Sequence, residues 1–460
     1  MPQPVYLAAE IRRIEQAAAE ARPPLMERAG AAAAELAIRL CGDKTKDIVV
    51  LAGPGNNGGD AKVVARILQE RFFRVSLSTQ GIPEKNAGLV IDGLFGIGLA
   101  RPIEGPFARL VDWINAQPCP VLALDVPSGL DADTGRVLGR AVRATHTITF
   151  IGLKPGLLTL DGPDHCGEIC VSDLSLSGLP PTGWVAEPAL FTNVLKVRPR
   201  NFHKGMAGSV GILGGAEGMT GAALLAGRAA LKMGAGRVYV GLLEHQPVDE
   251  SALELMVRNA DDLLGLDLDS IVIGPGLGQS ERAETLLGAV LASDIPCVLD
   301  ADALSLIAAN EDLRRACAKR AAETLLTPHP AEAGRLLAET TAHVQEDRLK
   351  AARALSANLN AHVVLKGAGS ILVARDGHWF VNTSGNPGMA SAGMGDVLAG
   401  ILGALLAQKL SGESALVLGV HLHGSAADEC VRSGTGPVGL TASETITPAR
   451  RIWNSWLAAR

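Results

Sequence analysis

Short runs of apolar residues alternate along the chain with longer stretches of mixed polarity. Ile48–Ala52 is a continuous aliphatic run, a glycine-rich segment follows at 53–60, and Ala61–Gln69 has the apolar spacing of an amphipathic helix. The same order of apolar run, glycine segment and helical pattern returns between Ser209 and Met233. Strands separated by helices favour right-handed crossovers in a parallel sheet, so the pattern predicts an α/β protein with two doubly wound domains.

Further apolar runs extend both sets of predicted strands. In the first half we expect strands at Val75–Ser78, Leu89–Asp92, Val121–Asp125 and Thr147–Ile151. In the second half we expect them at Ser209–Leu213, Val238–Leu242, Ser270–Ile273, Pro296–Leu299, Thr324–Leu326, His362–Leu365 and Ser370–Val373. Three helices close the chain, and Thr441 with Glu444 forms a capping box at the start of the last.

A segment rich in proline and glycine, at 179–188, separates the two sets of elements. Such segments are typical of the linkers between domains. The expected domains are therefore residues 1–190 and 197–460.

The composition narrows the class of protein. With 47% hydrophobic and 20% charged residues, the chain can bury large cores, which excludes a disordered protein. A formal charge of -6 and 3% aromatic residues argue against a nucleic-acid partner. Seven cysteines without regular spacing argue against a disulfide framework. The longest apolar run, Val397–Ala407, is too short to span a membrane, and residues 1–20 lack a signal-peptide pattern, so we expect a cytoplasmic enzyme without a membrane partner.

The segment 386–396 carries the clearest candidate chemistry. Small residues precede Asp396, which stands directly before the helical pattern Val397–Gln408. Free backbone N–H groups at a helix start bind anions, and an adjacent carboxylate can accept the proton of a hydroxyl that attacks a phosphoryl group. The alternative is that Asp396 only caps the helix, although capping needs no preceding run of small residues.

Three other segments of the second half end predicted strands. Gly274–Gly278 and Lys366–Ser370 are glycine-rich, and Thr327–Pro330 places His329 on a rigid turn. Ligands of α/β proteins bind at such strand ends, which favours a binding role for His329 over a purely structural one. No Gly-Lys-Ser/Thr sequence follows any glycine loop, which excludes a P-loop nucleotide-binding site.

Polar residues also follow the strands of the first half. Gly55–Asp60 could cradle a pyrophosphate, while Asp92 and the turn Asp125–Gly129 offer hard oxygen ligands for an alkali or alkaline-earth cation. Asx residues are common in turns, so each residue alone is weak evidence. Their shared position at strand ends favours a binding site.

These motifs resemble a known arrangement over nearly the whole chain. Residues 25–30, 55–60 and 124–135 look like the NAD(P)H-hydrate epimerase domain. Residues 203–205, 214–222, 274–278 and the Asp396 loop look like the ADP/ATP-dependent NAD(P)H-hydrate dehydratase, a ribokinase-like protein. The fused order is similar to that of the bifunctional NAD(P)H-hydrate repair enzymes.

The resemblance implies repair of hydrated nicotinamide nucleotides, NADHX and NADPHX. The first domain would interconvert the C6 epimers with a potassium ion. The second would use ADP or ATP with Mg2+ to phosphorylate the C6 hydroxyl and then eliminate phosphate. A homo-oligomer is expected for such proteins. The alternative function is a ribokinase-like small-molecule kinase whose N-terminal domain is a non-catalytic binding module.

The resemblance also implies roles for individual residues. In the epimerase domain Asp125 would be the catalytic base, and the hydrate would contact Asn56, Asn57, Gly58, Gly59, Asp60, Gly96, Ile97, Gly98, Leu99, Ala100, Arg101, Pro102 and Asp125. Potassium would be bound by Asn57, Asp92 and Ser128. In the dehydratase Asp396 would be the base, the hydrate would contact Ala222, Gly276, His329 and Asp396, and the nucleotide would contact Lys366, Gly367, Ala368, Gly369, Ser370 and Gly395.

The sequence departs from the family pattern in three places. Ala61 and Lys62 stand where the family usually has Gly-Tyr, and the segment between Ser78 and Leu89 is short by about one helix and one strand. In the second half Met394 replaces a serine of the glycine loop. The first two departures concern the predicted epimerase, while the third leaves Gly395 and Asp396 in place.

Overall fold

The chain forms two compact units, each with its own sheet. The structure is a computed structural model that describes residues 2–79, 81–83, 87–176, 180–244 and 249–458. Residues 3–184 form the N-terminal unit, and residues 185–460 together with the first two residues form the C-terminal unit. Both units are mixed α/β structures with parallel strands, so the predicted fold class is confirmed.

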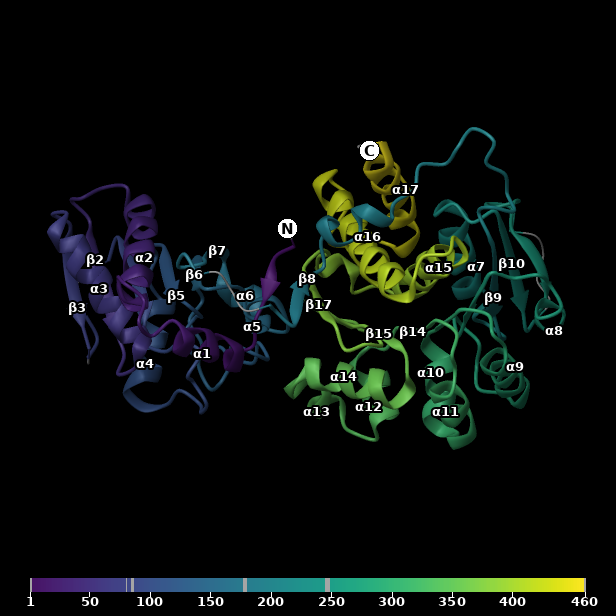
Figure 1. Ribbon diagram of the computed structural model, residues 1–460, viewed down its shortest axis with the longest axis horizontal. Coiled ribbons are helices and arrows are strands. Elements are labelled where there is room, and N and C mark those ends of the chain that lie inside the picture. The colour runs from purple at the N-terminus through teal and green to yellow at the C-terminus, as the bar shows by residue number, and fades with distance from the viewer. Residues whose placement is uncertain (1, 80, 84–86, 177–179, 245–248, 459–460) are drawn as a thin grey trace. The chain divides into compact units, whose positions relative to one another are not determined.

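The N-terminal unit contains a six-stranded parallel sheet (Figure 1). Its strands, in spatial order, are β3 (Arg74–Ser78), β2 (Asp47–Ala52), β4 (Leu89–Gly93), β5 (Val121–Leu124), β6 (His146–Phe150) and β7 (Glu168–Ser172). The two-residue strand β1 (Pro4–Val5) pairs with residues of β8 (Gly183–Val185). The order of strands reverses between β2 and β4, and such a switch point opens a crevice at the carboxyl ends of the strands.

Alternating residues of β2 build a three-layer sandwich. Ile48 and Val50 pack in the core with α1 (Ala8–Ala17), α2 (Leu25–Cys41) and α3 (Asn56–Glu70). Val49 and Leu51 pack on the opposite face, against α4 (Gly105–Asn115). Both faces of a parallel strand are therefore covered, which explains its continuous apolar sequence. Two short helices, α5 (Pro155–Leu158) and α6 (Gly162–Cys166), follow β6.

The C-terminal unit has a larger sheet that is parallel over most of its width. Its spatial order is β17 (Trp379–Asn382), β16 (Ser370–Val373), β15 (His362–Leu365), β14 (Thr324–Leu326), β13 (Cys297–Leu299), β12 (Ser270–Ile273), β9 (Ser209–Gly214), β10 (Arg237–Leu242) and β11 (Met256–Asn259). Only the pairs β15–β16 and β16–β17 of this order are antiparallel. The order reverses between β9 and β12, which makes this edge a second switch point.

Helices cover both faces of this sheet (Figure 1). One layer consists of α7 (Thr220–Lys232), α15 (Met394–Ala407), α16 (Gly412–Arg432) and α17 (Ala442–Ala458). The other contains α9 (Glu281–Ala292), α10 (Ala301–Ala309), α11 (Glu311–Ala318), α12 (Pro330–Leu337), α13 (Thr341–Glu346) and α14 (Arg348–Leu359), and the one-turn helix α8 (Ala260–Leu263) follows β11. None of the helices in the described ranges is long and apolar enough to cross a membrane.

Three helices begin earlier than the apolar pattern predicts. The predicted start at Ala61 is wrong, because α3 begins at Asn56. Likewise α7 begins at Thr220 instead of Ala222, and α15 begins at Met394 instead of Val397. The first turn of a helix has free N–H groups and, apart from Met394, the residues missed in these three cases are small or polar and add nothing to the apolar periodicity. The glycine segments therefore form helix starts as well as loops.

The other predicted elements agree with the structure within a few residues, but some strands have no counterpart in the predicted pattern. These are β1, β7, β8, β11 and β17. β7 and β11 lie at sheet edges, where exposed residues interrupt the apolar run. One half of the predicted capping box at the start of α17 is present, because the Thr441 N–H donates to the Glu444 carboxylate over 2.8 Å. The other half is not, because the Thr441 hydroxyl donates to the same carboxylate and the Glu444 N–H donates to the Thr441 carbonyl oxygen.

Candidate functional sites

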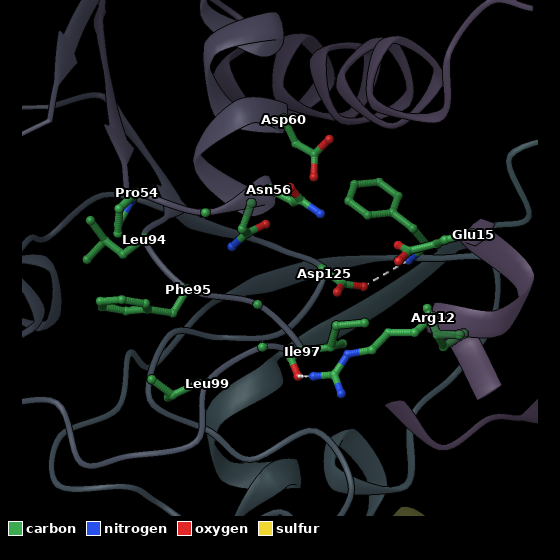
Figure 2. Close-up of a pocket in the computed structure, with 16 residues that line it drawn as sticks. Arg12, Glu15, Pro54, Asn56, Asp60, Leu94, Phe95, Ile97, Leu99 and Asp125 are labelled. Carbon is green, nitrogen blue, oxygen red and sulfur yellow. Dashed lines mark hydrogen bonds between the residues drawn. The ribbon is translucent and has the colours of Figure 1, made fainter. Parts of the chain in front are cut away.

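A cavity of about 400 Å³ lies at the switch point of the N-terminal unit. Its wall comes from α1, the start of α3, the loop after β4, and the ends of β5 and β6. Figure 2 shows the Asp60 carboxyl group directed into this cavity above Asp125. The predicted site residues in the lining are Asn56, Asn57, Asp60, Gly96, Ile97, Gly98, Leu99 and Asp125.

Asp125 is held by a lysine that the sequence reasoning missed. The Lys154 Nζ donates to Asp125 Oδ1 over 2.5 Å and also to Thr149 Oγ1 and the Phe150 carbonyl oxygen, each over 2.8 Å. The Lys154 side chain is fully buried. Asp125 itself has a φ of 64°, an unusual backbone conformation that Asp tolerates better than most residues and that directs its carboxylate toward the lysine and the cavity. The ion pair therefore fixes the orientation of the Asp125 side chain.

Asp60 lies in the same cavity and forms no ion pair with any Lys, Arg or His that the structure describes. Burial, together with the charges of Asp125 and Glu15, raises the pKa of Asp60 to about 8. Burial also raises the pKa of Glu15, and Asp125 adds to that effect. At neutral pH Asp60 is therefore mostly protonated and can donate a hydrogen bond or a proton.

Of the three predicted potassium ligands, Asn57 lines the cavity, while Asp92 and Ser128 are fully buried and are not part of its lining. Ser128 donates to Asp92 through its hydroxyl over 2.6 Å and through its N–H over 2.8 Å. Asp92 is fully buried; burial raises its pKa to about 6, against the opposing hydrogen bonds from Ser128. The amide Oδ1 and Nδ2 of Asn57 are buried and have no hydrogen-bond partner among the described residues. An unpaired buried amide is costly unless a ligand satisfies it.

Five of the residues assigned to hydrate binding are not in the cavity lining. A Cβ at Gly58 would lie 1.9 Å from the Gly53 carbonyl oxygen, so this glycine permits the tight turn from β2 into α3. A Cβ at Gly59 would lie 2.5 Å from the Met26 side chain, on the side of α3 that packs against α2. Ala100, Arg101 and Pro102 follow the lining residue Leu99 in the same loop.

The second candidate site surrounds the start of α15. Gly393 adopts a φ of 87° as the N-cap, and Asp396 is the third helical residue. Burial raises the pKa of Asp396 to about 7, and the nearby Asp300 adds to the shift, whereas Lys366 opposes it. Met394, which replaces the usual serine, is buried beneath this turn. Asp396 thus titrates near neutral pH, which suits a general base.

Lys366 and Asp300 lie beside this helix start. The Lys366 Nζ donates to Asp300 Oδ1 over 3.2 Å, and a Cβ at Gly395 would lie 3.2 Å from the same Nζ. Asp300 also accepts from the Thr327 hydroxyl over 2.6 Å. Burial lowers the pKa of Lys366, but Asp300 and Glu332 outweigh it, so the pKa is raised and the amine stays charged.

His329 caps α12 and adjoins the same charged group. Its Nδ1 accepts from the Ala331 and Glu332 N–H groups, and its Nε2 lies 3.2 Å from Glu332 Oε1. Burial lowers the pKa of His329, and Lys366 lowers it further. The structure therefore shows a structural, helix-capping role for His329, and its predicted contact with the hydrate stays a prediction.

The glycine loops of β9 and β12 are joined by backbone hydrogen bonds. The Ala216 N–H donates to the Gly276 carbonyl oxygen over 2.7 Å, and a Cβ at Gly276 would lie 3.3 Å from the Ala222 Cβ. The structure thus brings Ala222 and Gly276 together. It also brings Lys366, Gly395 and Asp396 close to one another around Asp300.

A buried arginine supports the predicted nucleotide-binding segment Lys366–Ser370. Arg348 donates to the carbonyl oxygens of Ala368 and Leu365 over 2.9 and 3.1 Å. Gly367 has a φ of 147°, and a Cβ there would lie 2.7 Å from the Arg348 guanidinium. Because that backbone conformation and close contact exclude a side chain, Gly367 lets the loop lie on the arginine.

Sequence reasoning missed Arg12, Glu15, Lys154, Asp300 and Glu332. Asp300 and Lys154 each follow a predicted strand closely, so the strand-end argument could have found them. Arg12 and Glu15 lie on α1, far along the chain from any recognised motif. Glu332 is in the first turn of α12, where an acidic residue is ordinary.

Comparison with known proteins gives matches in both units. Residues 210–447 match the family described as NAD(P)H-hydrate dehydratase, and residues 23–87 and 74–156 match the family described as YjeF-related protein N-terminus. The chain is 38% identical to the bifunctional NAD(P)H-hydrate repair enzyme Nnr of Coxiella burnetii, over 98% of this chain and 99% of that protein. The protein of the same name from Escherichia coli is also 38% identical, over 99% of this chain and 95% of its own length.

Solved structures resemble the C-terminal unit. The ADP/ATP-dependent NAD(P)H-hydrate dehydratase from Bacillus subtilis, co-crystallised with ATP and Mg2+, has a TM-score of 0.53 and 28% identity, covering 59% of this chain and 98% of that chain. A ribokinase-like superfamily protein from Enterococcus faecalis has a TM-score of 0.52 and 27% identity, covering 61% of this chain and 99% of its own.

The N-terminal match is in two pieces, and both contain residues 74–87. This break falls on the segment that the sequence suggests is shortened. The described residues between β3 and β4 form no helix or strand. The 494 positions aligned with the Coxiella protein exceed the 460 residues of this chain, so that relative contains residues with no counterpart here.

Proposed function

The chain belongs to the bifunctional NAD(P)H-hydrate repair family, and we propose that its two domains divide the two reactions of that family between them. The protein is an NAD(P)H-hydrate dehydratase that depends on ADP or ATP, and an NAD(P)H-hydrate epimerase. We assign epimerisation of the (6R) and (6S) hydrates to residues 1–190 and dehydration of the (6S) hydrate to residues 197–460.

The observation that carries the dehydratase assignment is Asp396 at the start of α15, beside the Lys366 ammonium group. Asp396 takes the proton of the C6 hydroxyl as that oxygen attacks the terminal phosphoryl group of the nucleotide. Phosphate then leaves C6 while the N1 electron pair forms the C6–N1 double bond. Loss of a C5 proton restores the dihydropyridine ring. Phosphorylation is needed because hydroxide is a poor leaving group and phosphate is a good one.

The transferred phosphoryl group carries charge that this site can stabilise. The first N–H groups of α15, including that of Gly395, offer an anion site, and Lys366 adds a positive charge beside it. Lys366, Gly367, Ala368, Gly369 and Ser370 bind the nucleotide in this proposal, while Ala222, Gly276 and His329 contact the hydrate. Carboxylate oxygens of Asp300 and Asp302 are hard ligands suited to Mg2+, which would neutralise the nucleotide phosphates.

Epimerisation uses the cavity of the N-terminal unit. Asp125 takes the proton of the C6 hydroxyl, and the C6–N1 bond opens to an aldehyde while its electron pair moves to N1. Asp60, which is protonated at neutral pH, supplies a proton to N1. Rotation about the C5–C6 bond and closure from the other face give the other epimer. Lys154 is a positioning residue that holds the Asp125 carboxyl group in place.

Asn57, Asp92 and Ser128 are suited to bind a potassium ion. Asn57 has a buried amide with no partner among the described residues, and Asp92 is a fully buried carboxyl group to which no described Lys or Arg is paired. A cation held by Asn57, Asp92 and Ser128 would satisfy both groups with hard oxygen ligands. Such an ion would fix the loop that carries Gly96, because a Cβ there would lie 3.4 Å from the Asn57 amide carbon.

The test is conversion of a mixed-epimer NADHX sample, followed by the returning near-ultraviolet absorbance of NADH. With nucleotide and Mg2+ in potassium buffer, we expect full recovery at a rate above spontaneous epimerisation. In sodium buffer we expect recovery to slow once the (6S) epimer is consumed. A stall at that point in potassium as well would contradict the epimerase assignment, and no recovery with either nucleotide would contradict the dehydratase assignment.

The oligomeric state and the cellular location of the protein stay predictions. Sedimentation equilibrium of the full chain tests the expected homo-oligomer. Fractionation of cells that produce the protein tests the cytoplasmic location.

A further inference from the structure

Helix α1 forms a wall of the epimerase cavity although the family match begins only at residue 23. Three of its residues, Ile11, Arg12 and Glu15, line the cavity. The helix is fixed at its start, because the Ala8 N–H donates to Asp133 over 2.7 Å. Ile11 and Ile14 are buried in the core. The position of Arg12 is therefore set by the fold.

Arg12 reaches the loop that follows β4. Its Nη2 donates to the Ile97 carbonyl oxygen over 3.2 Å, as the dashed line in Figure 2 shows. Arginine has five N–H donors, and this is the one hydrogen bond of Arg12 found among the described residues. The side chain is exposed, so its other donors are open to a ligand. Arg12 is thus hydrogen-bonded to the loop and still has donors that can bind an anion.

Arg12 can balance the charge of an anion in this cavity. Among the described residues of the lining, Arg12 is the sole cationic side chain, whereas Glu15, Asp60 and Asp125 are carboxylic acids. Lys154 is buried and already bonded to three oxygen atoms, so it is not available to a ligand. A nucleotide hydrate carries phosphate groups that need a counter-charge next to these acids. A guanidinium matches phosphate oxygens through paired N–H donors.

We propose that Arg12 binds a phosphate group of the hydrate in the epimerase cavity. The inference rests on the proposed epimerase function. Two phosphates are possible sources of the anion, namely the pyrophosphate that both substrates share and the 2′-phosphate that only NADPHX has. Both offer the same oxyanion chemistry, and comparing the two substrates distinguishes them.

The experiment compares Arg12→Gln with Arg13→Gln in the full chain. Both variants remove one positive charge from the same helix, but Arg13 is exposed and is not part of the cavity lining. We expect Arg12→Gln to raise the KM for (6R)-hydrates by about ten- to hundredfold, as for loss of a charge-assisted hydrogen bond. The kcat should stay within about twofold, and Arg13→Gln should behave as the wild type. The KM of Arg12→Lys should lie between that of Arg12→Gln and that of the wild type.

Each pattern of results has a defined meaning. An equal rise in KM for NADHX and NADPHX supports the pyrophosphate, and a rise for NADPHX alone supports the 2′-phosphate. A fall in kcat at constant KM overturns the proposal, because it means that Arg12 only positions the Ile97 loop. An unchanged KM, or the same change in Arg13→Gln, overturns it as well.

A binding measurement separates this inference from the epimerase assignment. Equilibrium dialysis of (6R)-NADPHX without nucleotide reports binding whether or not the protein epimerises. Any binding in the C-terminal unit is common to the two variants, so the difference between Arg12→Gln and Arg13→Gln isolates Arg12. If the wild type does not epimerise but Arg12→Gln still weakens binding, the inference stands and the epimerase assignment fails. Equal binding by both variants overturns the inference.

Discussion

The two candidate sites use the same residue types in different pairings. In the N-terminal cavity, Lys154 binds Asp125 directly, whereas Asp60 forms no ion pair with a described residue and has a pKa of about 8. In the C-terminal site, Lys366 binds Asp300, and Asp396 is the acid whose pKa is raised to about 7. The proposed base is the ion-paired acid in one site and the unpaired acid in the other.

This difference follows from the two reactions. Phosphoryl transfer needs a proton acceptor next to a phosphate, and an acid that titrates near neutral pH can accept a proton and later release it. Epimerisation needs an acid and a base in one cavity, and here Asp125 is bound to a lysine while burial raises the pKa of its neighbour Asp60 to about 8. The neighbours of a carboxyl group, more than its position after a strand, therefore decide its role.

The largest effect is expected for Asp396→Asn. This change removes the proposed base but keeps the shape of the side chain, so dehydration should fall by about a hundredfold to ten-thousandfold. Nucleotide affinity should stay within about threefold, since the helix start and Lys366 remain. Single-turnover dehydration and nucleotide titration measure the two quantities. Normal dehydration by this variant would show that another residue is the base.

Lys154→Met should affect only the other reaction. Epimerisation should fall by about a hundredfold or more, because Asp125 loses the group that orients it. Breaking this buried pair should also cost about 3–5 kcal/mol in the unfolding free energy of the N-terminal unit. The matched control is Lys62→Met, which removes an exposed lysine from α3. Epimerase rates and urea unfolding measure both effects, and a stable, fully active Lys154→Met would disprove the positioning role.

The pH dependence of dehydration should report Asp396. A base must be ionised to act, so the rate should be constant above about pH 7 and fall about tenfold per unit below it. The pKa of Asp396 is raised from its ordinary value to about 7, because burial and Asp300 disfavour the ionised form. A kcat/KM profile with (6S)-NADHX measures it. An inflection near the ordinary pKa of an aspartic acid would show that burial and Asp300 do not raise the pKa of Asp396.

The smallest effect concerns the departure from the family at Ala61. Ala61 is fully buried in α3, and a Cβ at Gly93 would lie 2.4 Å from its Cβ. Ala61→Gly restores the usual family residue, but it should lower stability by about 1 kcal/mol, since glycine weakens a helix interior. Epimerase activity should not rise. A severalfold gain in the epimerisation rate would instead mean that Ala61 limits this half of the protein.

The sequence predicted the parts of each site that lie close to a strand end. Asn56 and Asp60 follow β2, Asp125 follows β5, and Asp92 is near the carboxyl end of β4, so all four lie at one edge of the sheet. Sequence reasoning extended the binding loop to Pro102, beyond the part that lines the cavity, and it treated the start of α3 as a loop. These errors share one cause, because glycine-rich and polar residues carry no apolar period from which a helix start or a lining position can be read.

The sequence by itself determined the two α/β domains, their parallel strands and the family, because apolar runs, glycine segments and motifs are local patterns that one chain displays in order. Tertiary structure alone decided which acid pairs with which lysine. Lys154 meets Asp125 from the neighbouring strands β5 and β6, and Lys366 meets Asp300 from β15 and β13, which β14 separates in the sheet. Neither pair is formed by residues close together along the chain. Burial then sets the proton affinities of Asp60 and Asp396, and burial is a property of packing. Tertiary structure also placed Arg12, which belongs to a helix outside every recognised motif, beside the loop after β4.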